Sequence, residues 1–446
     1  MPSNKDILSA QRFNRRRLVT AFTSGTPGGR ELEPKSPVMP LLIGAVVGAV
    51  VLAVAAVLGL FAPTLPDGWE NNTLLVVKGT GARYYTISGQ LHPVANVTSA
   101  RLLSEAGKFS MVDVDASVLV DKPRGAQVGL SDVPDDVPAP ADLRSGQWAA
   151  CADSSAGNHV WVGSAPAGIT QAAMAVVRVG EQFYIVSGGQ SHYVNYTTAD
   201  GAYDPNVVLM ALGTSVLDAH PVSSEWLSLF EAGADVGAVG MDRLGAEVTG
   251  FSERLASVRI GSVIRVDDKR YLVVDNETIL QLTDFAYQMW TLGPKVKLEE
   301  MQLKSEIEAN YTDLESLKTA QAHASIPSNW PTALTAPIPS DAAPCVSLSI
   351  SEAGSFTELA AAPHGEWAAV TVAGGSGALV RDSIATGAVR LIADNGFSYS
   401  LGVDPTDSLT RLGYSGLDPT PVGKAWLNLV PSKEIDLTNE TAKKGG

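Results

Sequence analysis

The side chains that most often perform catalysis or bind metals are scattered along this chain of 446 residues. The six histidines form no H-E-x-x-H zinc helix, no G-x-S-x-G turn presents a serine nucleophile, and no G-x-x-x-x-G-K-[ST] loop is available for a phosphate. Asp132, Asp135 and Asp136 lie in a proline-rich stretch without EF-hand spacing, so a solvated acidic loop is expected. These motifs therefore predict no catalytic residue, no metal site and no cofactor.

The distribution of charge argues against nucleic acid as a partner. The formal net charge at pH 7 is −15, but residues 1–40 hold seven basic and three acidic side chains. The rest of the chain holds 25 basic and 44 acidic side chains, which leaves −19 on the main body. A body of this charge repels a phosphate backbone.

One segment has the length and composition of a membrane-spanning helix. No charged residue occurs between Ser36 and Pro66, and this window contains the apolar run Leu41–Ala62. At about 1.5 Å per residue this run covers about 33 Å, enough for a hydrocarbon core of roughly 30 Å. The apolar core of a cleaved signal peptide is shorter, so we predict a retained single-pass anchor. Gly44 and Gly48 lie on one face of this helix, where another helix can approach closely.

The basic residues before the apolar run predict its orientation. By the positive-inside rule, the cluster from Arg12 to Arg17 stays in the cytoplasm and everything after about Pro63 lies outside. Residues 5–23 are predicted to form a helix with an apolar stripe among arginines. This helix either docks on lipid or a partner protein, or it serves only to set the topology. The candidate docking residues are Arg12, Phe13, Arg15, Arg16, Arg17, Leu18 and Phe22.

The chain has two cysteines, Cys151 and Cys345, and both follow the apolar run. An oxidising compartment favours pairing them, and two buried free thiols are the alternative. A disulfide would close a loop of about 195 residues, for which the chain-entropy model gives roughly 5 kcal/mol.

The region after the apolar run contains an internal repeat with an offset of 200 residues. Residues 211–229 (ALGTSVLDAHPVSSEWLSL) and 411–429 (RLGYSGLDPTPVGKAWLNL) agree at ten of nineteen positions, so the similarity is not due to chance. In each copy Leu-Asp-x-x-Pro-Val predicts a turn and a helix start, followed by apolar anchors on the helix. The alternative role for the tryptophans is ligand stacking. The predicted core residues of the repeats are Pro221, Trp226, Leu227, Pro421, Trp426 and Leu427.

Strand patterns precede both of these helices. They predict β-hairpins over 182–194 and 388–401, and two further hairpins over 83–94 and 270–282. The third unit lacks the tryptophan helix and has instead a charged segment, 295–317, that is predicted to be an amphipathic helix.

These patterns divide the chain into eight predicted segments. They are 1–38 (basic helix and linker), 39–63 (transmembrane helix), 64–106, 172–233, 257–310 and 377–431 (repeats one to four), 107–171 with 318–376 (central domain) and 432–446 (polar tail).

Taken together, these segments resemble the EccB family, a membrane core component of the ESX (type VII) secretion systems of actinobacteria. The resemblance rests on QRFNRRRLVTAFTSG before the single span, LHPVANVTSARLL at 91–103, DKPRGAQVGLSDVPDD at 121–136, QWAAC at 147–151 and the doubled Pro-Val-x-x-x-Trp-Leu-x-Leu. It implies an α+β fold, with four periplasmic β-hairpin/helix repeats around a central β-rich domain closed by a Cys151–Cys345 disulfide.

The resemblance also implies a role and partners. The role is that of a structural subunit of the ESX translocon in the cell inner membrane, with a cytoplasmic N-terminus and a periplasmic C-terminal region. The implied partners are EccC, EccD and EccE, a second copy of the chain, membrane lipids and, through repeats similar to cell-wall-binding repeats, peptidoglycan. Members of the family are often named ATPases, so a nucleotide hydrolase and a peptidoglycan-binding module remain as alternatives.

Overall fold

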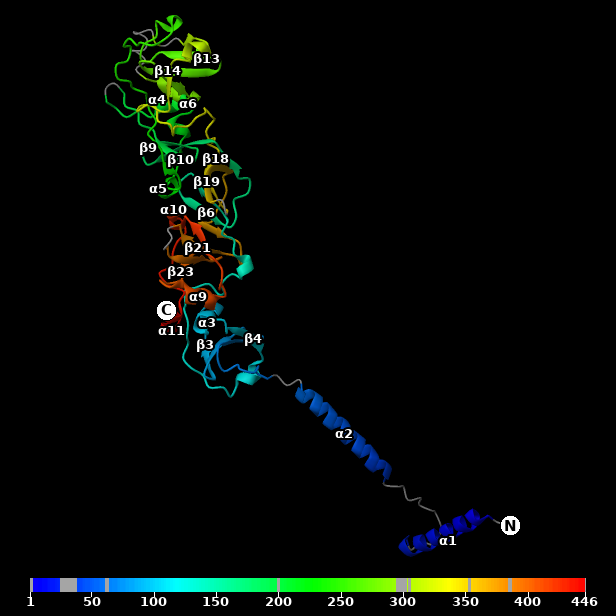
Figure 1. Ribbon diagram of the computed structural model, residues 1–446. Coiled ribbons are helices and arrows are strands. Elements are labelled where there is room, and N and C mark those ends of the chain that lie inside the picture. The colour runs from blue at the N-terminus through cyan, green and yellow to red at the C-terminus, as the bar shows by residue number, and fades with distance from the viewer. Residues whose placement is uncertain are drawn as a thin grey trace. The chain divides into compact units, whose positions relative to one another are not determined.

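The computed structural model describes residues 3–24, 38–60, 64–198, 201–293, 303, 306–351, 354–383 and 387–445 (Figure 1). The chain divides into an N-terminal unit, Met1–Leu65, and a C-terminal unit, Pro66–Gly446.

The N-terminal unit contains two helices. Helix α1 is Asn4–Ser24, and helix α2 is Val38–Leu60, whose side chains are described up to Val54. The described side chains of α2 are all exposed, and none of them is charged. No helix in the described part of the chain combines the length and apolarity that a bilayer crossing requires.

The C-terminal unit has a mixed α+β fold, and its described residues form five β-sheets. The first sheet, in the order β3-β2-β1-β4, consists of β1 (Thr73–Val77), β2 (Arg83–Ile87), β3 (Gln90–Pro93) and β4 (Ser110–Val114). The second, β11-β8-β9-β10-β12, consists of β8 (Met174–Val179), β9 (Gln182–Ser187), β10 (Gln190–Tyr193), β11 (His220–Pro221) and β12 (Glu231–Ala232). The third, β16-β13-β14-β15-β17, consists of β13 (Val263–Val266), β14 (Lys269–Asp275), β15 (Thr278–Leu282), β16 (Ile307–Glu308) and β17 (Lys318–Ala320).

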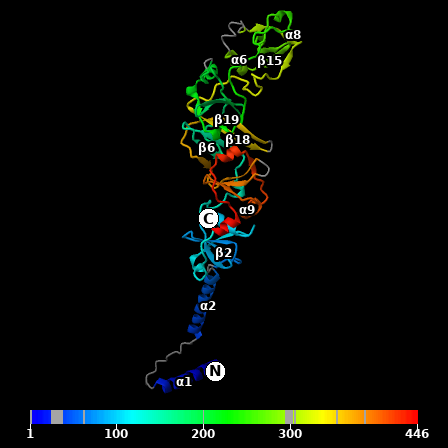
Figure 2. The ribbon, with the colours of Figure 1, turned by 90° about the vertical axis from the view of Figure 1, so that its left-hand side faces the viewer.

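The remaining two sheets come from the middle and the end of the chain. The six-stranded sheet, β20-β6-β5-β18-β19-β7, consists of β5 (Gln147–Ala152), β6 (Asn158–Val162), β7 (Thr170–Gln171), β18 (Ala342–Ser351), β19 (Gly354–Pro363) and β20 (Val370–Val372) (Figure 2). The last, β23-β22-β21-β24, consists of β21 (Ala378–Asp382), β22 (Val389–Ile392), β23 (Ser398–Ser400) and β24 (Thr420–Val422).

The four smaller sheets are built alike. In each, three consecutive strands form an antiparallel meander, and a short later strand pairs in parallel with the first strand of that meander. The meanders contain all four hairpins that the sequence predicts. Short helices lie between the strands: α3 (Val97–Leu103), α4 (Asn206–Ala211), α5 (Ser224–Leu227), α6 (Asp284–Thr291), α8 (Tyr311–Leu314) and α9 (Pro405–Leu412). Two more, α10 (Lys424–Asn428) and α11 (Asn439–Lys444), follow the last strand.

Local sequence explains where these helices begin and end. Asn96 caps α3 by accepting a hydrogen bond from the Ser99 amide at 2.8 Å. At the end of α9, Gly413 has φ of +90°, a left-handed conformation that glycine adopts without a steric penalty. The Tyr414 amide then donates to the Leu409 carbonyl at 2.7 Å and closes the helix. The matching glycine after α4, Gly213, has φ of +76°.

Helices from the two ends of the C-terminal unit pack together. Helix α3 contacts both α9 and α11, as Figure 1 shows near the C-terminus. The contact includes the C-terminal turn of α3, where carbonyl groups have no partner within the helix. Asn439 donates to the Leu102 carbonyl at 2.7 Å, and Arg411 donates to the Ser104 carbonyl. The first and last small sheets are thus joined through their helices.

The charged segment 295–317 is not one amphipathic helix in its described part, so that prediction is wrong there. Residues 294–302, 304 and 305 lie outside the described residues. After them, Ile307–Glu308 forms β16 beside β13, and only α8 is helical. Arg270 pairs with Glu306 at 2.7 Å and Arg265 pairs with Glu308. Pairing with an existing sheet and its arginines therefore overrides the local helical pattern.

Candidate functional site

The described residues contain no group of three or more His, Cys, Asp or Glu side chains placed to hold a metal ion. The features that can support a function are a disulfide, a cluster of tryptophans, a repeated histidine contact and one groove, all in the C-terminal unit.

The disulfide joins Cys151 of β5 to Cys345 of β18. The two residues lie directly opposite each other in antiparallel strands, with their Cα atoms 4.0 Å apart, and both are fully buried. The pairing that an oxidising compartment favours is therefore present. The bond closes the chain across 194 residues, between the first strand of the six-stranded sheet and the strand with which the chain returns to that sheet.

A histidine and a carboxylate lie beside the disulfide. His159 of β6 lies opposite Cys151, and its Nε2 is 3.0 Å from Oδ2 of Asp153. Its Nδ1 lies 3.1 Å from the Ala368 carbonyl, so both ring nitrogens lie beside oxygen atoms. Burial raises the pKa of Asp153, but hydrogen bonds from His159, the Ser155 side chain and backbone amides outweigh this effect and hold the pKa well below its ordinary value. This contact lies at the turn of the β5–β6 hairpin.

The two repeat tryptophans lie in one buried cluster with Trp148 of the six-stranded sheet. Trp226 of α5 is 0% exposed and Trp426 of α10 is 3% exposed. The Trp426 ring meets the Trp148 ring edge-on, with centroids 6.3 Å apart. Leu227 and Leu427 pack against the same cluster from half-buried positions. These four residues therefore form a core that joins three sheets.

The two prolines of the repeat are not core residues, and the predicted helix start is wrong. Pro221 lies half-buried in β11, and Pro421 is exposed in β24. Both strands are at the edge of their sheets, where the missing proline N–H leaves no ladder bond unmade. Helix α5 begins later, where Ser223 accepts a hydrogen bond from the Trp226 amide at 3.0 Å.

The remaining predicted residues lie in the N-terminal unit. In α2, Gly44 and Gly48 each have open space where a Cβ would be, so both positions are free of described neighbours. The seven candidate docking residues are all exposed on α1: Arg12, Phe13, Arg15, Arg16, Arg17, Leu18 and Phe22. Their roles stay predictions.

A repeated histidine contact was missed at the sequence level. His92 of β3 and His192 of β10 each place Nδ1 on a backbone carbonyl, Ala126 at 2.8 Å and Ala234 at 2.9 Å. The residue before each alanine is a glycine that packs against the imidazole ring. Burial lowers the pKa of His192. A sequence signal exists, because the pattern Gln-x-His-x-Val occurs at 90–94 and again at 190–194. The Gly-Ala pair that completes each contact follows its histidine at a different distance, so the same offset does not align the two pairs.

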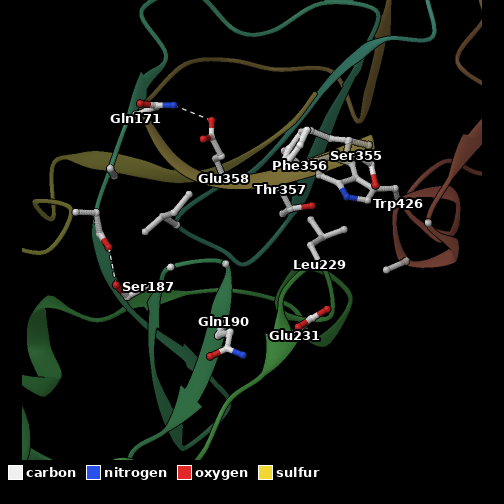
Figure 3. Close-up of a pocket in the computed structure, with 18 of the residues that line it drawn as sticks. Gln171, Ser187, Gln190, Leu229, Glu231, Ser355, Phe356, Thr357, Glu358 and Trp426 are labelled. Carbon is white, nitrogen blue, oxygen red and sulfur yellow. Dashed lines mark hydrogen bonds between the residues drawn. The ribbon is translucent and has the colours of Figure 1, made fainter. Parts of the chain in front are cut away.

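A groove of about 1120 Å³ opens between the six-stranded sheet, the β9–β10 turn and α10 (Figure 3). At one end Gln171 donates to Glu358 at 2.7 Å, and at the other Trp426 lies beside Ser355 (Figure 3). Glu231 faces them from β12. No sequence pattern indicates this groove, because its walls come from segments far apart along the chain.

The chain matches a known protein family over almost its full length. A family model described as "Type VII secretion system ESX-1, transport TM domain B" matches residues 1–442, which is nearly the whole chain. The chain belongs to the EccB family. The match extends from before α1 into α11, so it includes both units.

Curated relatives match a shorter stretch. The chain is 36% identical over 111 residues to "ESX-1 secretion system ATPase EccB1" of Mycobacterium tuberculosis, covering 25% of this chain and 22% of the relative. It is 32% identical over 111 residues to "ESX-3 secretion system ATPase EccB3" of Mycolicibacterium smegmatis, covering 25% of this chain and 21% of the relative. The matched region of the chain thus spans about a fifth of the length of each of these relatives.

Solved structures share the fold of this EccB-family chain. A chain in an intact ESX-5 inner membrane complex aligns with a TM-score of 0.65 and 18% identity, covering 99% of this chain and 95% of that one. The EccB3 dimer from the ESX-3 core complex aligns with a TM-score of 0.62 and 17% identity, covering 83% of this chain and 100% of that one.

Proposed function

We propose that this EccB-family chain is a structural core subunit of an ESX (type VII) secretion system, which builds the inner-membrane complex and its periplasmic assembly. The observation that carries the proposal is the family match over residues 1–442. Solved structures of an ESX-5 inner membrane complex and of an EccB3 dimer contain chains with this fold.

The proposal places residues 39–63 in the inner membrane, with the N-terminus in the cytoplasm and the C-terminal unit in the periplasm. Three features support this arrangement: the uncharged run in α2, the arginines of α1 before it, and the disulfide after it. Gly44 and Gly48 then pack against another transmembrane helix, and lipids surround the rest.

In this arrangement α1 docks on other core subunits, for which EccC, EccD and EccE are the proposed partners. Its arginines and apolar side chains are exposed, as a docking helix requires. In the periplasm, four hairpin-and-helix repeats around the disulfide-closed domain form a dimer. The four similar small sheets and the shared tryptophan cluster support this organisation.

The experiment is affinity purification of the full-length protein from its native membrane in mild detergent, with sizing and mass spectrometry. We expect a large particle that contains EccC-, EccD- and EccE-like proteins. A second protein lacking residues 1–24 should stay in the membrane but lose these partners. A lone monomer or dimer of the full-length protein in several detergents would contradict the proposal, and full recovery of partners by the truncation would contradict docking through α1.

The word ATPase in the relatives' names makes nucleotide hydrolysis the second candidate function. We favour a scaffold because the sequence has no G-x-x-x-x-G-K-[ST] loop to hold a nucleotide phosphate. ATP hydrolysis that follows the protein through every column, at constant activity per mole, would support the enzyme. Activity that separates from the protein peak would support the scaffold.

A further inference from the structure

The outer edge of β19 is only partly covered. Strand β19 has ten residues, whereas its outer neighbour β7 has two, which pair with Ala360 and Ala361. One more bond, from the Ala172 amide to the Leu359 carbonyl at 3.0 Å, ends this pairing. The chain then turns away into β8, so among the described residues no strand pairs with the first half of β19 on this side.

Two residues on this free edge turn their backbone groups into the groove. Successive residues of an antiparallel strand direct their N–H and C=O to opposite sides. Since the Leu359 carbonyl faces β7, the backbone groups of Thr357 and Ser355 face the same edge. Both residues line the groove (Figure 3). Backbone donors and acceptors at a free edge bind extended polypeptide.

The turn Gly188–Gly189, which has no side chains, forms the opposite wall. A Cβ on Gly189 would lie 3.8 Å from the Thr357 carbonyl oxygen, so the turn approaches the edge of β19 at Thr357. Ser355 lies two residues from Thr357 on the same edge and also lines the groove.

The charges of the groove indicate what binds. The charged residues that line the groove, Glu231 and Glu358, are both acidic. A basic side chain on the bound molecule complements these carboxylates.

We propose that the groove between β19, the β9–β10 turn and α10 binds an extended segment of a partner protein that carries a lysine or arginine. The segment makes main-chain hydrogen bonds at Ser355 and places its basic side chain at Glu231. The groove has a volume of about 1120 Å³ and a free strand edge along one wall, which an extended segment can pair with. The proposed assembly role does not require this site.

The test uses full-length protein in a neutral detergent and a fluorescein-labelled peptide of alternating valine and lysine, with a valine–glutamate peptide as its counterpart. We expect saturable binding of the lysine peptide by fluorescence anisotropy. The affinity for the glutamate peptide should be lower by a factor of about ten or more. No saturable binding of the lysine peptide up to about 1 mM, the weak limit of specific recognition, would overturn the proposal.

Matched variants separate this site from general attraction to an acidic protein. Ser355→Pro removes the free edge N–H and should weaken binding about three- to tenfold, whereas Ser355→Ala keeps it and should not. Glu231→Gln should weaken binding about two- to fivefold, and Glu315→Gln, the same charge change at an exposed position outside the groove, should have no effect. If each variant and its control changed the affinity for the lysine peptide equally, while their circular dichroism spectra matched that of the native protein, the proposal would also be overturned.

Discussion

At the scale of single residues, the two repeat tryptophans occupy equivalent positions but have different surroundings. The Trp226 indole donates to the Ala150 carbonyl at 3.2 Å, whereas the Trp426 indole has no acceptor in the described part of the chain. Both rings are buried against the same cluster. The repeated sequence predicts the burial of both rings, but it contains no information about the carbonyl that only one of them reaches.

This difference gives a paired prediction. Trp226→Phe and Trp426→Phe remove similar apolar area, but only the first breaks a hydrogen bond, and the second removes an unsatisfied buried donor. We expect Trp226→Phe to lower the free energy of unfolding by about 1–3 kcal/mol more than Trp426→Phe. Urea titration of the two variants, monitored by circular dichroism, measures the difference. Equal losses would show that the indole N–H groups do not differ as the structure indicates.

Asp153 predicts a pH dependence. Hydrogen bonds hold its folded-state pKa well below the unfolded value of about 3.9. A depressed carboxyl pKa contributes stability that is present above the unfolded pKa and is lost as the pH falls toward the folded pKa. Below about pH 4, the melting temperature should therefore fall more steeply for the native protein than for Asp153→Asn. Parallel curves for the two proteins between about pH 4 and 2 would contradict this prediction.

At the scale of elements, the four hairpins are the part of the fold that the sequence predicts well. Their strands are long enough to show alternation. Glycine marks three of the turns, and Asp275–Asn276 marks the fourth. The parallel edge strands were missed because they have only two to five residues and their partners are far away in the chain. The prolines and segment 295–317 were misassigned for a related reason, since sheet edges rather than local propensity determine their conformation.

The groove illustrates the same limit for sites. Its lining includes the β9–β10 turn, the β19 edge and α10, which only the folded sheets bring together. No motif or spacing connects them in the sequence. The tryptophan and cysteine positions, by contrast, can be predicted from the sequence. A large apolar residue in a repeated helix and a chain with two cysteines are signals that do not depend on the folded arrangement of distant segments.

The histidine contacts of β3 and β10 predict the effect of two glycine substitutions. A Cβ on Gly125 would collide with the ring of His92, and one on Gly233 with the ring of His192. Gly125→Ala and Gly233→Ala should each lower the free energy of unfolding by about 1–3 kcal/mol. Gly240→Ala is the control, because a Cβ there meets nothing within 4 Å and its φ is not left-handed. Melting temperatures of the three variants test this, and similar values for all three would contradict the repeated contact.

At the scale of the whole molecule, the disulfide closes a large excursion of the chain. The second and third sheets both lie between Cys151 and Cys345, where they form one insertion between β7 and β18 of the six-stranded sheet. The strands that the disulfide joins, β5 and β18, are also paired by hydrogen bonds. The covalent bond and the strand pairing therefore stabilise the same junction.

Removal of this bond should have a large effect on stability. For a loop of 194 residues the chain-entropy model gives about 5 kcal/mol, so Cys151→Ala with Cys345→Ala should lower the free energy of unfolding by roughly 3–5 kcal/mol. Urea titration gives the value, and the native protein under strong reductant is the matched comparison. An unchanged midpoint in both samples would show that strand pairing alone holds the junction.

The same bond also determines how the chain responds to force. If tension is applied between residues 66 and 445, it passes directly from β5 to β18 through the sulfur atoms, and the insertion carries none of it. At about 3.5 Å per extended residue, the 194-residue separation keeps roughly 680 Å of contour length out of the stretched chain. A machine that pulls on this subunit would thus meet a short tether, and the second and third sheets would stay folded until the bond is reduced.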